Sequence, residues 1–278
     1  MSYQEFAPHP KLQEYIKCFW VLERDFCATN GAIDILPDSY MEMIFNIGSS
    51  CWIEDSPAPR EMPPCYLANL LAKPFRLQST GVLRTIGVRF YAWGFYPLMK
   101  VDRPLAGAIY PLGEWQHLQG HLRCAEGPRV KEILDAELAA YLPHAAAPTS
   151  VRCGLSRQLT QWRGDLQVRK FAEQCHLSPR QLERQLQQYA HIAPKTLARR
   201  LRFEQARDQL SRNPALDFSQ LALDCGYADQ AHLSREFKFF SNRTLRQFVG
   251  EISGIEEHLR CGVGFGVDCG VDCGVAGG

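Results

Sequence analysis

The chain of 278 residues, with 46% hydrophobic and 22% charged residues and a formal net charge of +1, has the composition of a folded globular protein rather than a disordered one. No run approaches the roughly 20 consecutive apolar residues of a membrane span, and the first residues lack the pattern of a secretory signal. Because the eleven cysteines are scattered and suit reduced thiols, we expect a cytoplasmic protein with no membrane partner and no disulfide framework.

The first half of the chain is predicted to be mostly β, within one domain over residues 1–142. Ser39–Ile47 is rich in β-forming residues and ends at a glycine and two serines, which predicts a strand. Thr85–Tyr91 is a second predicted strand, which stops before Gly94. Lys131–Leu142 has apolar residues at helical spacing and is predicted as an amphipathic helix.

Two further segments flank a second domain, which is predicted to be helical. Residues 143–154 contain prolines and small residues, which indicates a linker. Residues 155–250 have helical patterns almost throughout, including a helix from Pro194 to about Leu210. Residues 251–278 are rich in glycine and cysteine and are predicted to be a disordered tail.

The small net charge conceals a basic helical domain. Residues 1–150 carry 13 Lys and Arg against 16 Asp and Glu, whereas residues 155–250 carry 16 against 9, a surplus of seven positive charges. A basic block within a nearly neutral chain favours phosphate binding, because neutralising phosphates releases condensed counterions. Charge alone leaves a solvated basic surface as the alternative.

The helical domain contains an internal repeat with a spacing of about fifty residues. Each copy has the layout of a helix, a tight turn and a second helix, which predicts two helix-turn-helix units. The apolar positions of the first copy are Val168, Phe171, Ala172, Cys175, Leu177, Leu182 and Leu186, and those of the second are Phe218, Leu221, Ala222, Cys225, Tyr227, Leu233 and Phe237. Their packing leaves the opposite face of each second helix pointing outward.

Candidate contacts to double-stranded DNA lie on these outward faces and on the helix between the copies. Arg can bind guanine and Gln can bind adenine, and helix starts near Ser178 and Ala228 offer free N–H groups to phosphates. The predicted contact residues are Ser178, Arg180, Gln181, Arg184, Lys195, Arg199, Arg200, Asp229, Gln230, His232 and Arg235. Two such helices on one rigid helix can enter successive major grooves about 34 Å apart. No cofactor or metal is predicted.

These residues resemble the DNA-binding domain of the AraC/XylS family of bacterial transcriptional regulators. The resemblance covers residues 155–250 and is carried by three blocks, at 177–182, 192–203 and 226–238. It implies a sequence-specific transcriptional regulator rather than an enzyme, and leaves open whether that regulator is an activator or a repressor. It also implies that Arg180 and Arg184 read bases from the first unit, and Gln230 and Arg235 from the second. RNA polymerase and a second copy of the chain are candidate partners.

Two positions and one short segment depart from the family pattern. His176 and His191 stand where the family has glycine, and both are expected to adopt positive φ at a cost of about 1 kcal/mol each. The closing Phe-Gly-x-Thr-Pro of the family is Ser-Asn-Arg-Thr-Leu over residues 241–245, where Asn242 can tolerate a left-handed turn. These departures bear on local stability and tight DNA binding more than on the fold.

The first half of the chain is similar to a small sensor-type domain that is often fused to these regulators. The similarity rests on residues 18–20, 36–38, 44–48 and 86–90. It implies a cupin-like β-barrel with a sensing or dimerising role and a small-molecule effector. The expected fold is therefore α+β with two domains, a mostly-β cupin-like domain and an all-α domain whose two helix-turn-helix units are joined by a linker helix.

Three features leave other interpretations open. The aromatic cluster Phe90–Tyr96 fits either the wall of a ligand pocket or a hydrophobic core. The cysteines allow a redox or metal sensor, although Cys175 and Cys225 fall on core-facing positions. The departures at residues 241–245 allow a protein-interaction module that has lost DNA binding. No common catalytic motif is present in the sequence.

Overall fold

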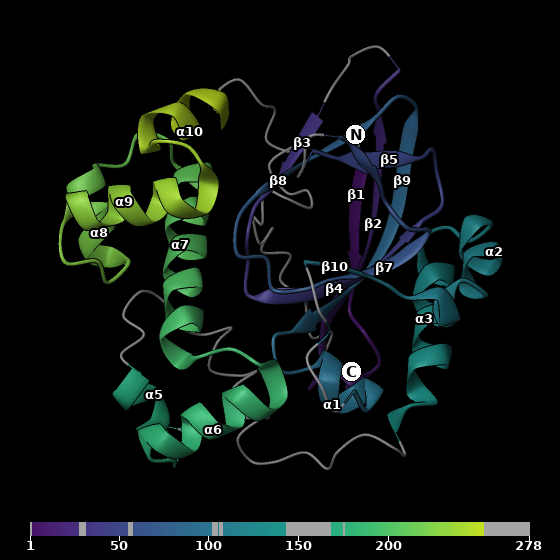
Figure 1. The fold of residues 1–278 in the computed structure, drawn as a ribbon, viewed down its shortest axis with the longest axis horizontal. Helices are drawn as coiled ribbons and strands as arrows, with labels where there is room; N and C mark the ends of the chain where they lie inside the picture. The colour runs from purple at the N-terminus through teal and green to yellow at the C-terminus, as the bar shows by residue number, and fades with distance from the viewer. Residues whose placement is uncertain are drawn as a thin grey trace, which may run out of the picture.

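The computed structural model shows a mostly-β N-terminal domain followed by an all-α C-terminal domain, as predicted (Figure 1). It describes residues 2–27, 32–54, 58–101, 105, 108–142, 168–174 and 176–252. The predicted linker at 143–154 lies outside the described residues, as do residues 253–278 of the tail predicted at 251–278. The exact domain boundaries therefore stay predictions. No helix in the described part of the chain is long and apolar enough to cross a membrane.

The N-terminal domain is built from two antiparallel sheets. The six-stranded sheet has the order β1 (Ser2–Phe6), β2 (Ile16–Asp25), β9 (Val82–Tyr91), β4 (Tyr40–Asn46), β7 (Cys65–Ala68) and β10 (Ile109–Pro111). The four-stranded sheet has the order β3 (Ala32–Ile35), β8 (Phe75–Ser79), β5 (Cys51–Ile53) and β6 (Arg60–Glu61). The two predicted strands are β4 and β9, which pair with each other near the centre of the larger sheet. Two antiparallel sheets with a buried core between them agree with the predicted cupin-like domain.

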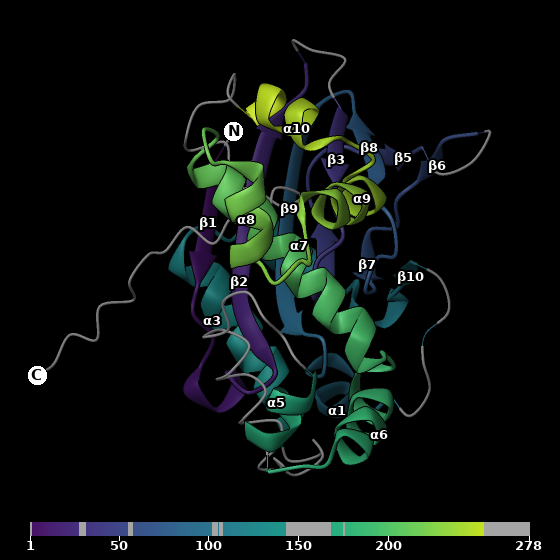
Figure 2. The same ribbon diagram turned by 90° about the vertical axis from the view of Figure 1, so that its left-hand side faces the viewer.

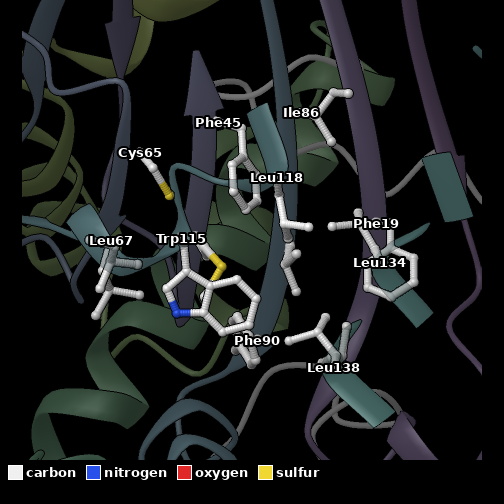
Figure 3. Packing of buried hydrophobic residues seen from close by; sticks show 14 of the residues in the cluster. Phe19, Phe45, Cys65, Leu67, Ile86, Phe90, Trp115, Leu118, Leu134 and Leu138 are labelled. Atoms are coloured by element: carbon white, nitrogen blue, oxygen red, sulfur yellow. The ribbon is translucent and has the colours of Figure 1, made fainter. Parts of the chain in front are cut away.

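Side chains on β4 alternate between two buried faces of the larger sheet. Met41, Met43 and Phe45 face one core, and Glu42 and Ile44 face the space between the sheets, because successive side chains of a strand point to opposite sides. Figure 3 shows the first core, which packs sheet residues against Trp115, Leu118, Leu134 and Leu138.

Short helices cover the outer face of the six-stranded sheet. They are the 3-10 turns at Pro10–Leu12 and Gly113–Trp115 and the helices α1 (Phe95–Met99), α2 (Leu118–Arg123) and α3 (Pro128–Ala139). The predicted helix at Lys131–Leu142 is α3. It begins three residues earlier because Pro128 occupies the first turn, where a missing N–H is harmless.

The aromatic cluster Phe90–Tyr96 is hydrophobic core. Phe90, Phe95 and Tyr96 belong to the core under the helices, whereas Tyr91 and Trp93 pack against the C-terminal domain. None of the residues from Phe90 to Tyr96 lines the cavity between the sheets. The interpretation as a pocket wall is therefore wrong for that cavity.

The C-terminal domain consists of two helix-turn-helix units at opposite ends of one long helix (Figures 1 and 2). Its helices are α5 (Val168–Gln174), α6 (Pro179–Ala190), α7 (Pro194–Arg212), α8 (Phe218–Asp224), α9 (Gln230–Ser241) and α10 (Leu245–Ile252). The helix predicted from Pro194 to about Leu210 is α7. It ends at Asn213, whose extended backbone stops the helix.

The middle of α7 lies against the N-terminal domain. Arg200 is 5% exposed and donates hydrogen bonds to the carbonyl oxygens of Asp38 and Leu70, both at 3.1 Å. One turn further on, the Ser39 hydroxyl donates to Glu204 at 3.1 Å. These buried polar contacts join the linker helix to the loops at one end of the two sheets.

Candidate nucleic-acid interface

The first helix-turn-helix unit is formed by α5 and α6. Phe171, Ala172, Leu182 and Leu186 are buried between them, as the repeat predicts. At the turn, His176 has φ of 55°, so the predicted positive φ is confirmed. The N–H of Leu177 donates to the carbonyl of Ala172 at 2.8 Å and closes the turn, whereas Cys175 lies outside the described residues.

The second unit, formed by α8 and α9, repeats this geometry. Leu221, Ala222, Leu233 and Phe237 are buried at the equivalent positions. Gly226 adopts φ of 73° at the turn. The N–H of Tyr227 donates to the carbonyl of Ala222, again at 2.8 Å. The same hydrogen bond in both copies confirms that the sequence repeat is a structural repeat.

Four of the predicted contact residues are exposed cations that no other described residue pairs with. Arg180 and Arg184 lie on the outward face of α6, Lys195 lies at the start of α7, and Arg235 lies on the outward face of α9. Their charges remain available to an external anion or to a base edge. These four residues are the strongest part of the predicted set.

Three of the predicted contacts cap the recognition helices instead of being free. The Ser178 hydroxyl accepts from the N–H of Gln181 at 3.3 Å, and the Gln181 side chain accepts from the N–H of Ser178 at 2.8 Å, which is a reciprocal capping box. Asp229 accepts from the N–H of His232 at 2.7 Å. These side chains fix where α6 and α9 begin, and a cap of this kind typically contributes about 1 kcal/mol.

Gln230 and His232 are positioned by neighbours within their own unit. The Ser219 hydroxyl donates to Gln230 at 3.1 Å, which ties the start of α9 to α8. The His232 ring accepts a weak hydrogen bond from the N–H of Ala228 at 3.4 Å and lies edge-on to Tyr227. Gln230 keeps its amide N–H groups for an external acceptor, since only its oxygen is engaged.

Two predicted contacts on α7 are occupied by other parts of the protein. Arg199 forms a two-point ion pair with Glu236, at 2.7 and 2.9 Å, and lies over the rings of Phe239 and Phe240. Arg200 is buried against the N-terminal domain. In this arrangement Arg200 cannot reach a DNA phosphate, which corrects the prediction. The sequence shows that both residues are basic, but it does not show which surface of α7 packs against the rest of the protein.

Sequence reasoning missed the polar surroundings of the start of α9. Ser219, Leu223 and Ser234 line an open hollow together with residues 228–231. Leu223 is 62% exposed there, an unusual position for a large apolar side chain in a folded domain. Ser219 lies two residues after Asp217, the residue that caps α8. A polar residue at this helix start was the signal from which the sequence could have indicated the hollow.

The closing segment that departs from the family pattern still forms a tight turn. Asn242 has φ of 57°, as its tolerance of the left-handed region predicted. The buried Ser241 hydroxyl donates to the carbonyl of Phe237 at 2.6 Å and accepts from the N–H of Arg243 at 3.1 Å. The turn between α9 and α10 therefore forms without the glycine of the family pattern.

Two family models match the chain. A domain of unknown function, DUF6597, matches residues 4–105, and a helix-turn-helix domain matches residues 171–250. The C-terminal domain is an AraC-type helix-turn-helix domain. This AraC-type domain makes the protein a DNA-binding transcriptional regulator, and the family matches point to a regulator rather than an enzyme. The family resemblance predicted from the three blocks is therefore confirmed.

Several solved structures are similar to this chain. ToxT from Vibrio cholerae is 11% identical, covers 91% of this chain and 100% of its own, and has a TM-score of 0.46. ToxT bound to (E)-4-(8-methylnaphthalen-1-yl)but-3-enoic acid is 10% identical, with the same coverage and a TM-score of 0.47. An AraC-type regulator from Chromobacterium violaceum is 25% identical over 38% of this chain and 95% of its own, with a TM-score of 0.34. No curated protein matches by sequence.

The cysteines of the described residues are free thiols, four of them buried and two exposed. Burial raises the pKa of Cys225 in the second unit to about 12, which keeps this thiol protonated and poorly nucleophilic at neutral pH. Among the described residues, no group of three or more His, Cys, Asp and Glu side chains is arranged to hold a metal ion.

Proposed function

We propose that the protein is a sequence-specific regulator that inserts α6 and α9 into successive major grooves of DNA. The carrying observation is the pair of matched units, each of which presents unpaired arginine on the outward face of its second helix. Arg180 and Arg184 would read bases from α6, and Gln230 and Arg235 from α9. Ser178 and Asp229 would act indirectly, by fixing the helix starts.

The length of α7 supports this proposal. Its 19 residues span about 28 Å along the helix axis, close to the roughly 34 Å that separates successive major grooves on one face of DNA. The ion pair between Arg199 on α7 and Glu236 on α9 holds the second unit in a fixed position on this helix. Lys195 would supply a backbone phosphate contact from the start of α7.

The proposal is tested by selecting bound sequences from a random duplex pool with the full-length protein. We expect two short motifs whose centres lie about one helical turn apart. Affinity for the selected duplex should fall steeply as salt rises, with a slope that reports the number of phosphate contacts. Random duplexes should bind more weakly at every salt concentration but lose affinity with a similar slope, since that slope reports phosphate contacts and base contacts add a free energy that salt does not screen.

A matched variant separates base reading from phosphate binding. Arg235→Ala should blur one of the two selected motifs and leave the other sharp, whereas Lys195→Ala should weaken both about equally. A single motif, or retention with no salt dependence, would contradict the proposal. No duplex binding at low salt would favour the alternative of a protein-interaction module.

Control by a small molecule bound in the N-terminal domain belongs to the same proposal. It is supported by a cavity between the two sheets, one end of which touches the segment that contacts α7. A homodimer and a contact with RNA polymerase stay predictions from the family resemblance.

A further inference from the structure

A cavity lies between the two sheets of the N-terminal domain. It offers about 50 Å³ to the centres of water-sized molecules, several times what one water requires. Most of its wall is apolar or aromatic and comes from both sheets. Its lining includes Trp20, Asp38, Tyr40, Glu42, Ile44 and Thr85.

Three residues that line this cavity each carry a buried polar atom without a hydrogen-bond partner among the described residues. These atoms are the second carboxylate oxygen of Glu42, the hydroxyl of Thr85 and the indole N–H of Trp20. Glu42 is 6% exposed, Thr85 3% and Trp20 1%. Because a buried polar group without a hydrogen bond is costly, three such groups around one cavity indicate a place built for a polar ligand.

The strand register arranges these groups along the cavity. Glu42 pairs with Arg89 on β9, Ile44 pairs with Gly87, and Thr85 lies two residues further along β9. The Trp20 indole lies over Gly87, where an added Cβ would come within 2.0 Å of the ring. Glu42 therefore occupies one end, the indole the middle and Thr85 the other end.

The charge of the wall selects the kind of ligand. Glu42 and Asp38 are the charged residues that line the cavity among the described residues, and both are acids. Arg89 donates to one Glu42 oxygen at 2.7 Å and leaves the other free to accept. The aromatic walls add rings whose faces attract cations. The two carboxylates would therefore repel an anion and would accept hydrogen bonds from a cation.

We propose that this cavity binds a small organic amine, with its ammonium group at Glu42 and its apolar part along Trp20 and Ile44. The Trp20 N–H and the Thr85 hydroxyl can hold an oxygen of the same ligand, as in an amino alcohol. This inference rests on the proposed control by a small molecule and names the class of molecule.

The Glu42 end of the cavity is also the end that touches the DNA-binding domain. Asp38 and Tyr40 line the cavity, and the intervening Ser39 donates to Glu204 on α7. Arg200 on α7 donates to the carbonyl of Asp38. An ammonium group at Glu42 therefore lies beside the segment that positions the linker helix.

The experiment compares three probes of five heavy atoms each, n-butylamine, 1-butanol and propionate, by calorimetric titration of the full-length protein at pH 7. We expect the amine to bind about tenfold more tightly than the alcohol, because the acceptor makes a charge-assisted hydrogen bond with the ammonium. Propionate should not bind. Equal binding of all three, stronger binding of propionate, or no binding of any probe would overturn the proposal.

Two variants locate the site. Glu42→Gln should abolish the preference for the amine over the alcohol. Because this change also alters the partner of Arg89, Leu77→Phe serves as a second variant that fills the cavity and leaves the Glu42–Arg89 pair intact. It should abolish binding of both the amine and the alcohol. Unchanged amine binding in both variants would place the site elsewhere and overturn the proposal.

DNA retention is measured on the same samples without probe. If the wild-type protein is retained on DNA but does not bind the amine, only the ligand inference is wrong. If it binds the amine but is not retained on DNA, only the proposed DNA-binding function is wrong.

Discussion

The two helix-turn-helix units have the same backbone plan but different cores. The first unit shares its core with the N-terminal domain, since Tyr91 and Trp93 pack in the same cluster as Phe171 and Leu182. The second unit has an aromatic core of its own, supplied by α7, α9 and α10, to which the N-terminal domain contributes Leu36. The first unit therefore depends for its position on the N-terminal domain more than the second unit does.

The turns of the two units differ in a related way. His176 and Gly226 occupy the same turn position with positive φ, but only glycine does so without strain. At the end of α6, His191 also has positive φ, and its ring stands edge-on to Tyr96 of the N-terminal domain at 4.6 Å. Burial lowers the pKa of His191, which keeps this ring neutral at neutral pH. Contact with the N-terminal domain thus compensates for strain in the first unit.

The largest expected effect is a loss of stability that differs in place between the cores of the two units. Trp93→Ala should destabilise α5 and α6, and Phe237→Ala should destabilise α8 and α9, each by about 3–5 kcal/mol, because both remove a fully buried aromatic ring. Hydrogen exchange resolved by segment measures where protection is lost. Loss of protection in α8 and α9 from Trp93→Ala would show that the two units are one cooperative core.

The next effect concerns Glu204, on the helix that joins the units. Burial, and then the nearby Asp38, raise its pKa from 4.5 to about 8, against the opposing charge of Arg207. The folded protein keeps this proton to higher pH than the unfolded chain, so the contribution is complete below about pH 4.5 and is lost as the pH rises through about 8.

Glu204→Gln should remove this pH dependence, because the amide cannot ionise. Wild-type protein should lose melting temperature relative to the variant between pH 5 and pH 9. Ser39→Ala removes the hydroxyl that donates to Glu204 and is the matched control, which should keep the slope. Parallel melting curves for wild type and Glu204→Gln across this range would rule the assignment out.

An intermediate effect compares base reading by the two units. Arg184→Ala and Arg235→Ala should each reduce discrimination at one base pair by roughly 1–3 kcal/mol, at different positions of the selected site. Competition binding with single-base variants of the selected duplex measures both. Equal losses on specific and random DNA would reassign these residues to phosphate contacts.

The smallest effects concern the turns. His176→Gly should stabilise the protein by about 1 kcal/mol, since the exposed ring makes no compensating contact that the structure shows. Gly226→Ala should destabilise it by about 1–2 kcal/mol. His191→Gly should have an effect near zero, because relief of strain is offset by loss of the Tyr96 contact. Denaturant unfolding measures all three, and a large gain from His191→Gly would contradict the role given to that contact.

Much of the DNA-binding domain could be predicted from the sequence. The repeat spacing placed both units. Positive φ was predicted at His176 and His191 because the family has glycine there, and at Asn242 from its residue type. The strands β4 and β9 were found because β-branched and aromatic residues cluster between turn residues. Glu42, a carboxylate within an otherwise apolar strand, was a visible signal of the cavity that the sequence reasoning did not use.

Local chemistry decides these features, because helix caps, turn residues and apolar periodicity act between residues a few positions apart. The sequence by itself therefore determined that two helix-turn-helix units exist and which faces of α6 and α9 point outward. The tertiary structure decided which surfaces of those units pack against the N-terminal domain. Whether Arg200 meets a phosphate or the carbonyl of Asp38 depends on packing between segments 162 residues apart, and such packing follows from the summed burial of many side chains rather than from any local pattern.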